Sequence, residues 1–255
     1  MDYLGLNGKH ILDTGASSGI GRQTALLLAE CGAKLSIVDR NEEQLAVTLG
    51  NLKNEGHHAY VIDFSDIEGL EAKIKDIIKE SGTFDGVAQC VGITEDLPVT
   101  SYKFARLHRV MTINFYSFFE LVRVISKKGN FNEGLSIVAL SSTAANCGVT
   151  AQSAYGASKA AMNGAMRCMA RELAPKKIRV NTILPGPTDT EMYRAHLVLK
   201  SELDEDTGVK KPGRNYLGVN APIDVANAIA FLLSQASRTI TGIELPVDGG
   251  YSSCG

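Results

Sequence analysis

Short apolar runs alternate with longer helical patterns along most of the chain. Seven runs of four to six residues have the composition of buried strands: 9–13, 35–38, 59–62, 87–91, 136–140, 179–184 and 243–247. Between them, apolar residues recur at helical spacing over 20–31, 41–54, 102–127 and 154–174. Strands that alternate with helices in this way predict βαβ units, and therefore an α/β fold with a parallel sheet.

The alternation continues over residues 1–255 without a linker or an internal repeat, so we expect a single domain. It weakens only over 187–220, where two prolines and three glycines interrupt the helical pattern. Such a segment is a natural lid over a substrate. Its larger side chains would give the lid a partly apolar surface, or would instead pack a subunit contact: Met192, Tyr193, His196, Leu197, Leu199 and Tyr216.

Composition and charge exclude several classes of function. The chain carries 26 basic and 28 acidic residues, a formal charge of -2, and no block of like charge. We therefore expect neither nucleic acid nor a membrane surface as a partner. The five cysteines show no metal-ligand spacing, and the five histidines form no HExxH motif, which argues against a metal site. Widely spread free thiols and the lack of an export signal predict a cytoplasmic protein.

A glycine-rich turn follows the first expected strand and opens the helix at residue 20. Glycines let backbone N–H groups approach a pyrophosphate, and the helix N-terminus supplies partial positive charge to hold it. Because strand, turn and helix occur in the required order, the segment predicts a nucleotide site rather than an ordinary turn. The candidate binding residues in this turn are Gly15, Ser17, Ser18, Gly19, Ile20 and Gly21.

The end of the second strand indicates which nucleotide is preferred. Asp39 lies 24 residues after Gly15, where a carboxylate accepts hydrogen bonds from ribose hydroxyls and repels a 2′-phosphate. NAD is therefore expected rather than NADP. Two alternatives remain: Asp39 caps the helix that starts near Asn41, or the neighbouring Arg40 pairs with a 2′-phosphate.

Three polar residues near the centre of the chain are candidates for acid–base chemistry. Tyr155 and Lys159 are four residues apart, so a helix places them on one face, where a lysine cation would favour the phenolate. Ser142 follows an apolar strand and would emerge at the carboxyl edge of the sheet, ready to donate to a substrate oxygen. Ser141 should point to the other face of that strand.

These motifs resemble, in order and spacing, those of the short-chain dehydrogenase/reductase family. The resemblance covers essentially the whole chain and rests on Thr14-Gly15-x-x-x-Gly19-x-Gly21, Asp63, Gly92, Asn114, Ser142, Tyr155-x-x-x-Lys159, Asn181, Pro185-Gly186 and Asp248-Gly249-Gly250. It implies a Rossmann-type, doubly wound, mainly parallel sheet of seven strands with helices on both faces. It also implies hydride transfer between a nicotinamide cofactor and a carbonyl or secondary alcohol.

The resemblance assigns a role to each matching catalytic residue. Tyr155 would be the proton donor and acceptor, Lys159 would bind the nicotinamide ribose and lower the pKa of Tyr155, and Ser142 would polarise the carbonyl. Asn114 would hold a water in a proton relay; the alternative is a polar helix residue satisfied by water.

The resemblance also extends the cofactor site beyond the glycine turn and Asp39. Asp63 would contact the adenine amino group with Phe64 beside it. The turn formed by Cys90, Val91 and Gly92 would lie along the adenosine ribose. Pro185, Gly186 and Thr188 would close over the nicotinamide amide.

Two positions depart from the usual pattern of the family. Gln89 and Cys90 stand where an Asn-Asn pair is common, so the amide network that braces this strand is expected to be rewired. Cys90 is interpreted as a buried, inert thiol rather than a reactive one. Asp13 replaces an aliphatic residue in a central strand, where a carboxylate is costly unless it is paired or protonated. His10 or a backbone donor is a candidate partner.

Two functions remain open at this stage. The first is an NAD-dependent oxidoreductase of a secondary alcohol or ketone: the chain broadly resembles 3-oxoacyl carrier-protein reductases, but a 3-oxoacyl thioester, a steroid and a sugar all remain candidate substrates. The second is a nicotinamide-binding regulatory or scaffold protein without turnover. The resemblance further implies a homodimer or homotetramer, and four residues would supply apolar surface between subunits or face the core: Phe115, Phe118, Phe119 and Leu121.

Overall fold

The sheet of the computed structural model is parallel throughout and has the strand order β3-β2-β1-β4-β5-β6-β7. The structure describes residues 3–195, 197 and 216–253. The strands are β1 (His10–Thr14), β2 (Lys34–Asp39), β3 (His58–Val61), β4 (Phe84–Gln89), β5 (Phe131–Leu140), β6 (Arg179–Pro185) and β7 (Glu244–Val247). The α-helices described are α1 (Gly19–Glu30), α2 (Glu42–Asn51), α3 (Ile67–Ser81), α4 (Phe104–Met111), α5 (Ser117–Ile125), α6 (Ser153–Leu173) and α8 (Pro222–Leu233).

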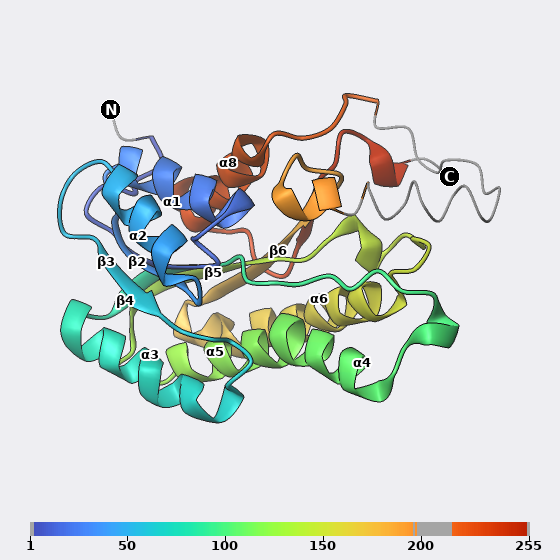
Figure 1. Ribbon diagram of the computed structural model, residues 1–255. Coiled ribbons are helices and arrows are strands. Elements are labelled where there is room, and N and C mark those ends of the chain that lie inside the picture. The colour runs from blue at the N-terminus through green and yellow to red at the C-terminus, as the bar shows by residue number, and fades with distance from the viewer. Residues whose placement is uncertain (1–2, 196, 198–215, 254–255) are drawn as a thin grey trace.

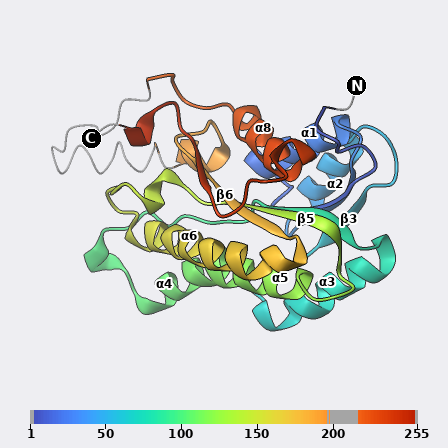
Figure 2. The same cartoon turned by 180° about the vertical axis from the view of Figure 1, so that it is seen from behind.

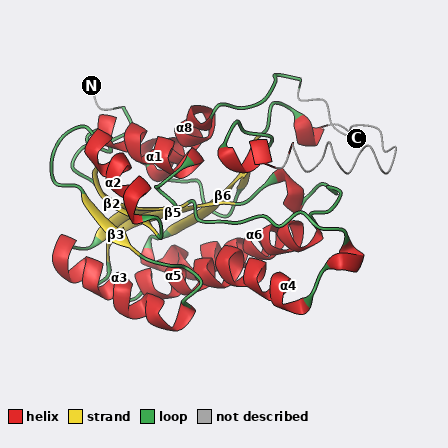
Figure 3. Ribbon diagram, viewed as in Figure 1, coloured by secondary structure: helices red, strands yellow, loops and turns green. Residues whose placement is uncertain are grey.

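Helices cover both faces of this sheet, as expected for a doubly wound fold (Figure 3). Helices α1, α2 and α8 lie on one face, and α3, α5 and α6 lie on the other (Figures 1 and 2). Each face has its own buried cluster of aliphatic and aromatic side chains. Because the central strands are buried on both sides, they are apolar along their length rather than alternating. The predicted fold class and all seven expected strands are confirmed.

The strand order reverses between β1 and β4, and this reversal positions the site. In open α/β sheets, ligands bind outside the carboxyl ends of the strands at such a switch point. The turn after β1 and the turn after β4 meet there: a Cβ atom on Gly15, whose φ is +75°, would lie 2.9 Å from the Cys90 carbonyl carbon. A Cβ on Gly21 would lie 2.2 Å from the Gly15 carbonyl oxygen, so α1 rests directly on the turn. Larger residues cannot occupy these two positions without moving the backbone.

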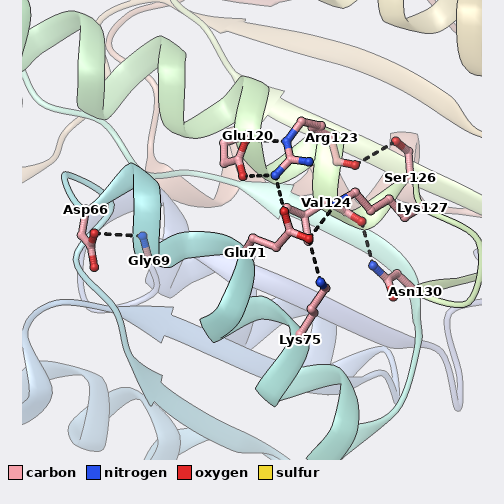
Figure 4. A network of polar contacts seen from close by, with 10 residues as sticks. All are labelled: Asp66, Gly69, Glu71, Lys75, Glu120, Arg123, Val124, Ser126, Lys127 and Asn130. Carbon is pink, nitrogen blue, oxygen red and sulfur yellow. Dashed lines mark hydrogen bonds and ion pairs between the residues drawn. The ribbon is translucent and has the colours of Figure 1, made fainter.

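An exposed network of charges joins α3 to α5 on the face of the sheet that these two helices and α6 cover (Figure 4). Glu71 on α3 accepts from Lys75 and from Lys127, each at 2.7 Å, and also pairs with Arg123 on α5. The hydrogen bonds from Lys127, Lys75 and Arg123 hold the pKa of Glu71 far below its ordinary value. Because these groups are accessible to water, the network aligns the two helices rather than adding much stability.

The helix expected over 102–127 is interrupted, so that expectation is wrong in one detail. Residues Thr112–Tyr116 form a π-helical turn between α4 and α5. Asn114 lies in this turn with its side chain fully occupied: it donates to the Ile93 carbonyl at 3.0 Å and to Ser158 Oγ at 2.9 Å, and accepts from the Ile93 amide at 2.8 Å. A widened turn of this kind often marks a functional site.

Asp13 lies in β1, fully buried between Ile37 of β2 and Ala88 of β4. Neither of its carboxyl oxygens has a hydrogen-bond partner within the described residues. The expectation that His10 satisfies it is wrong, because the His10 ring contacts the Thr83 carbonyl and Ser36 Oγ instead. Burial raises the pKa of Asp13 well above its ordinary value, which leaves protonation as the remaining explanation of its tolerance in the core.

Candidate active site

A cavity of about 580 Å³ opens at the carboxyl edge of the sheet and extends from the glycine turn to α6. Its volume is within the range of cofactor and substrate pockets. Every cofactor-binding residue expected from the sequence contributes to its wall, and so do Ser142, Tyr155 and Lys159. Asn114 does not line the cavity; it lies behind the wall and acts on it through Ile93 and Ser158.

The glycine turn and β2 form one end of the cavity. Asp39 Oδ2 accepts from the Ser17 amide at 3.4 Å, and its Oδ1 accepts from the Asn41 amide at 3.0 Å. Asp39 does not cap α2, because Asn41 occupies the cap and accepts from the Gln44 amide at 3.1 Å. The carboxylate therefore lies beside the turn, with lone pairs left for a ligand.

Further residues extend this end toward the adenine position expected from the sequence. Asp63 is exposed, and its Oδ1 accepts from the Ser65 amide at 2.8 Å, which lowers the pKa of the carboxyl. Phe64 is buried in the core and also lines the cavity. Arg40 is exposed, and its charge acts on Asp63.

At the end of β4 and in the turn after it, Gln89 and Cys90 take the place of the Asn-Asn pair that is common in the family. Gln89 Oε1 accepts from the Thr14 hydroxyl at 2.7 Å, and that hydroxyl accepts from the Cys90 amide at 3.2 Å. This pair of bonds ties β4 to β1 directly below the glycine turn. Cys90 is partly buried, and burial raises the pKa of its thiol well above the ordinary value, which agrees with an inert thiol.

Ser142, Tyr155 and Lys159 meet at the other end of the cavity. Ser142 follows β5, and its hydroxyl lies close enough to the phenol of Tyr155 on α6 to lower the pKa of that phenol. One turn further along α6, the ammonium of Lys159 lies 5.8 Å from the centre of the Tyr155 ring. The neighbouring Ser141 hydroxyl points elsewhere, to the Lys159 carbonyl at 3.3 Å, as strand alternation requires.

Burial dominates the ionisation of Tyr155 and Lys159. It raises the pKa of the Tyr155 phenol above its ordinary value; Ser142 opposes this rise, and the Asp96 carboxylate adds to it. Burial also lowers the pKa of Lys159 to about 8. The Lys159 ammonium donates to the Leu140 carbonyl at 2.6 Å. In this arrangement burial favours the neutral phenol of Tyr155.

The residues present fit a nicotinamide dinucleotide. Gly15 and Gly21 leave room that a side chain would fill, and the first amides of α1 face the same end of the cavity as Asp39. Gly92 leaves space beside Lys159, since a Cβ there would lie 3.2 Å from the Nζ atom. At the far end, the Thr143 hydroxyl holds the Pro185 carbonyl at 3.3 Å, which fixes the turn carrying Gly186 and Thr188.

The comparisons with known proteins agree with this geometry. A family profile described as "Enoyl-(Acyl carrier protein) reductase" matches residues 15–252. The chain belongs to the short-chain dehydrogenase/reductase family. It is therefore a member of a family of oxidoreductases that use nicotinamide cofactors.

Two curated relatives illustrate the range of the family. The chain is 32% identical over 260 residues to the 2,3-dihydro-2,3-dihydroxybenzoate dehydrogenase of Bacillus subtilis, covering 98% of each chain. It is also 32% identical over 247 residues to a 3-oxoacyl-(acyl-carrier-protein) reductase of Vibrio cholerae, covering 97% of this chain and 98% of the relative.

Solved structures show the same architecture. Levodione reductase superposes with a TM-score of 0.86 at 28% identity, covering 98% of this chain and 99% of the other. A dehydrogenase/reductase of Sinorhizobium meliloti superposes with a TM-score of 0.85 at 30% identity, covering 98% and 97%.

Sequence reasoning missed several side chains of the cavity wall. Thr94, Val149 and Gln152 lie on loops around Tyr155, and Tyr251 comes from the C-terminal turn. The only indication of these residues in the sequence is their position, just after a strand or just before α6. Of the lid residues expected over 187–220, Met192, Tyr193 and Leu197 line the cavity, whereas Tyr216 does not. His196, Leu199 and the glycines and prolines of 208–213 lie outside the described residues.

Within the described residues, no helix is long and apolar enough to cross a bilayer. The same part of the chain contains no group of three or more histidine, cysteine, aspartate or glutamate side chains placed to hold a metal ion.

The buried ammonium of Lys159 should cost stability at neutral pH. We expect Lys159→Met to raise the free energy of unfolding by about 3 kcal/mol at pH 7, because the unfolded lysine binds its proton more tightly than the folded one. The gain should shrink as the pH rises from about 8 toward 10.5, where the lysine loses its charge in both states. Urea unfolding at several pH values measures it. The exposed Lys128→Met serves as control, and lower stability of Lys159→Met at pH 7 would contradict the argument.

Proposed function

We propose that the protein is an NAD-dependent oxidoreductase that interconverts a secondary alcohol and a ketone. The observation that carries this proposal is the placement of the Ser142 hydroxyl beside the Tyr155 phenol, in the same cavity as the glycine turn and Asp39. A reacting oxygen between these two hydroxyls would receive both a hydrogen bond and a proton. NAD, when bound, supplies or accepts the hydride.

The chain's own groups divide the remaining work. Tyr155 gives its proton to the substrate oxygen during reduction and recovers it during oxidation. Ser142 donates to that oxygen as negative charge develops on it. Lys159, held by the Leu140 carbonyl beside Gly92, offers its other N–H donors to the ribose of the cofactor.

In this proposal Asn114 is a positioning residue. Its amide fixes Ser158, whose hydroxyl donates to the Tyr155 carbonyl at 2.7 Å, and it also fixes the backbone of Ile93 at the cavity wall. With its side chain occupied, a water in a proton relay would be held by backbone carbonyls of the π-helical turn rather than by the Asn114 amide.

Asp39 supports NAD over NADP. Its carboxylate stands beside the Ser17 amide, where a 2′-phosphate would meet a like charge. Arg40 is exposed on the neighbouring position, and we interpret it as a solvated surface charge.

The substrate is a small molecule with a secondary alcohol or a carbonyl. The two curated relatives described above match nearly the whole chain. So does an acetoacetyl-CoA reductase of Synechocystis, which is 33% identical over 252 residues and covers 98% of this chain and 99% of the relative. The cavity wall around Tyr155 combines Val149 and Met192 with Thr94 and Gln152. This mixed lining suits a 3-oxoacyl thioester, a steroid or a sugar, and the segment 187–220 would be its lid. The single domain spans 1–255 in this proposal.

The alternative is a nicotinamide-binding regulatory or scaffold protein without turnover. Such a protein needs no acid–base group, whereas Ser142, Tyr155 and Lys159 are all present and in contact range. This arrangement favours the enzyme.

The solvent face of α4 and α5 supports assembly into a homodimer or homotetramer. Phe104, Tyr116 and Phe119 are 79%, 40% and 48% exposed. Of the four residues expected at this contact, Phe118 and Leu121 are buried in the core instead, and Phe115 is partly buried. An exposed aromatic row of this kind is typical of a surface that a second copy covers.

The free thiols favour a reducing compartment, and we propose the cytoplasm. Within the described residues, Cys90, Cys147 and Cys168 form no disulfide. Cys254 lies outside the described residues.

Turnover should depend on the phenol of Tyr155. We expect Tyr155→Phe to lower kcat by about a thousandfold or more, because the substrate oxygen loses its proton donor, while NAD binding persists. Nicotinamide absorbance is followed with NAD or NADP and a panel of hydroxyacyl thioesters, hydroxysteroids and sugar alcohols. Undiminished turnover in the variant would exclude the proposed mechanism, and NAD binding without turnover on any class would favour the scaffold alternative.

Cofactor choice should depend on Asp39. Asp39→Ser removes the charge that opposes a 2′-phosphate, so we expect kcat/KM with NADP to rise and that with NAD to fall, each about tenfold or more. Arg40→Ser is the matched control and should leave the preference for NAD in place. A wild-type protein that already favours NADP would refute this assignment.

Assembly should depend on the aromatic row of α4 and α5. Phe119→Glu places a charge in the centre of the proposed contact, and we expect it to convert the oligomer to a monomer at micromolar concentration, as measured by light scattering. Val47→Glu, an equally exposed apolar position on α2, is the control. A monomeric wild-type protein would contradict the oligomer.

A further inference from the structure

Asp13 is one residue away from the cofactor turn and is not explained by the function proposed above. The family mechanism assigns no task to a carboxyl group in the middle of β1. Its side chain points to the face of the sheet covered by α1, because Ile11 and Ala88 on the same face belong to the cluster beneath that helix. Thr24 of α1 is also fully buried there, and its hydroxyl has no hydrogen-bond partner among the described residues.

The Cys90 thiol is the polar group that joins these two side chains. It lies next to the Asp13 carboxyl and next to the Thr24 hydroxyl. Cys90 is also the residue whose backbone touches Gly15 in the glycine turn. Asp13, Thr24 and Cys90 thus lie directly beneath the contact between the two turns that hold the nucleotide.

The surroundings of Asp13 oppose its ionisation on balance. Burial and the carboxylate of Asp39 on β2 raise its pKa, whereas the Cys90 thiol after β4 lowers it. The uncharged Thr24 of α1 and the ammonium of Lys159 on α6 act on Cys90. Asp13 forms no ion pair with a described residue. An unpaired carboxylate in this position would cost several kcal/mol, whereas the neutral acid can donate a proton to the thiol or the hydroxyl.

We propose that Asp13 is a positioning residue of the nucleotide half-site that works only as the uncharged acid, and that its ionisation weakens binding of the ADP portion of the cofactor. This proposal rests on the nucleotide site proposed above. Neutral Asp13 supports the packing of Gly15 on Cys90. Ionised Asp13 places a second negative charge behind the amides that receive the pyrophosphate, beside the charge of Asp39.

Thermodynamic linkage makes the effect reciprocal. If an anionic ligand disfavours ionisation of Asp13, then ionisation of Asp13 must disfavour the ligand by the same factor. Affinity should be constant while Asp13 is protonated in the free protein. Above that range it should fall by up to about tenfold per pH unit.

The test uses ADP, which carries the pyrophosphate but lacks the nicotinamide ribose that Lys159 would bind. Above about pH 7.5 its phosphates keep a constant charge. Calorimetric titration from about pH 7.5 to about pH 10 compares the wild type with Asp13→Asn, an uncharged residue of the same shape. We expect wild-type affinity to fall at alkaline pH and the variant to keep its affinity, so that the two curves separate by about tenfold or more.

Three further variants keep the result interpretable. Asp13→Val should behave as Asp13→Asn does. Asp85→Asn changes an acid at the opposite edge of the sheet, paired with Lys9 at 3.1 Å, and should retain the wild-type curve. Cys90→Ser replaces the thiol. If Cys90→Ser binds ADP equally well at all pH values while Asp13→Asn still loses affinity at alkaline pH, the titrating group is Cys90 and the proposal is wrong.

The remaining outcomes are equally decisive. The role of Asp13 would be overturned if the affinities of the wild type and Asp13→Asn for ADP changed with pH in the same way. It would also be overturned if the wild-type affinity did not change up to about pH 10. Either result would leave the nucleotide site intact. No binding of ADP to any of these proteins would instead overturn the nucleotide site itself. A carboxylic acid band in the infrared spectrum, present in the wild type and absent in Asp13→Asn, would support the neutral acid directly.

Discussion

Backbone packs directly on backbone where the turn after β1 meets the turn after β4, and the site is built around this contact. Gly15 touches Cys90, and Gly21 sets α1 on the Gly15 carbonyl, so the helix N-terminus, the switch point of the sheet and the cofactor turn share one rigid position. From there the cavity extends past β5 to α6, which carries Tyr155 and Lys159. The steric constraint at two glycines thus fixes the distance between the nucleotide end and the catalytic end.

Much of this arrangement could be predicted from the sequence because it follows from local patterns. Apolar runs gave the strands, and the glycine spacing with Asp39 gave the nucleotide end of the cavity. The expectations failed where a tertiary contact decides the outcome. The π-helical turn depends on the bonds of Asn114 with Ile93 and Ser158, which lie far away in sequence and leave no periodic signal. Likewise, helical spacing placed Tyr155 near Lys159, but only the structure shows that the ammonium donates to Leu140.

Two buried polar side chains of the site, those of Lys159 and Asn114, are held by hydrogen bonds rather than by ion pairs. Lys159 is 3% exposed and Asn114 is fully buried, and both are satisfied mainly by backbone groups rather than by opposite charges. Such bonds hold a side chain in one place without neutralising it, which suits a group that must meet a charged ligand. The ion pairs of Glu71 lie instead on accessible surfaces of α3 and α5.

The π-helical turn lies between two surfaces of the same long helical segment, the catalytic wall and the outer aromatic row. A π turn accommodates one residue more per turn than a regular helix, so the extra residue is absorbed locally and α5 keeps the register of a continuous α-helix. The widening falls at Asn114, whose side chain reaches Ile93 and Ser158, while Phe118 stays in the core and Phe119 stays exposed. The backbone at the catalytic wall can therefore depart from α-helical geometry without a change in the face that α5 presents to solvent.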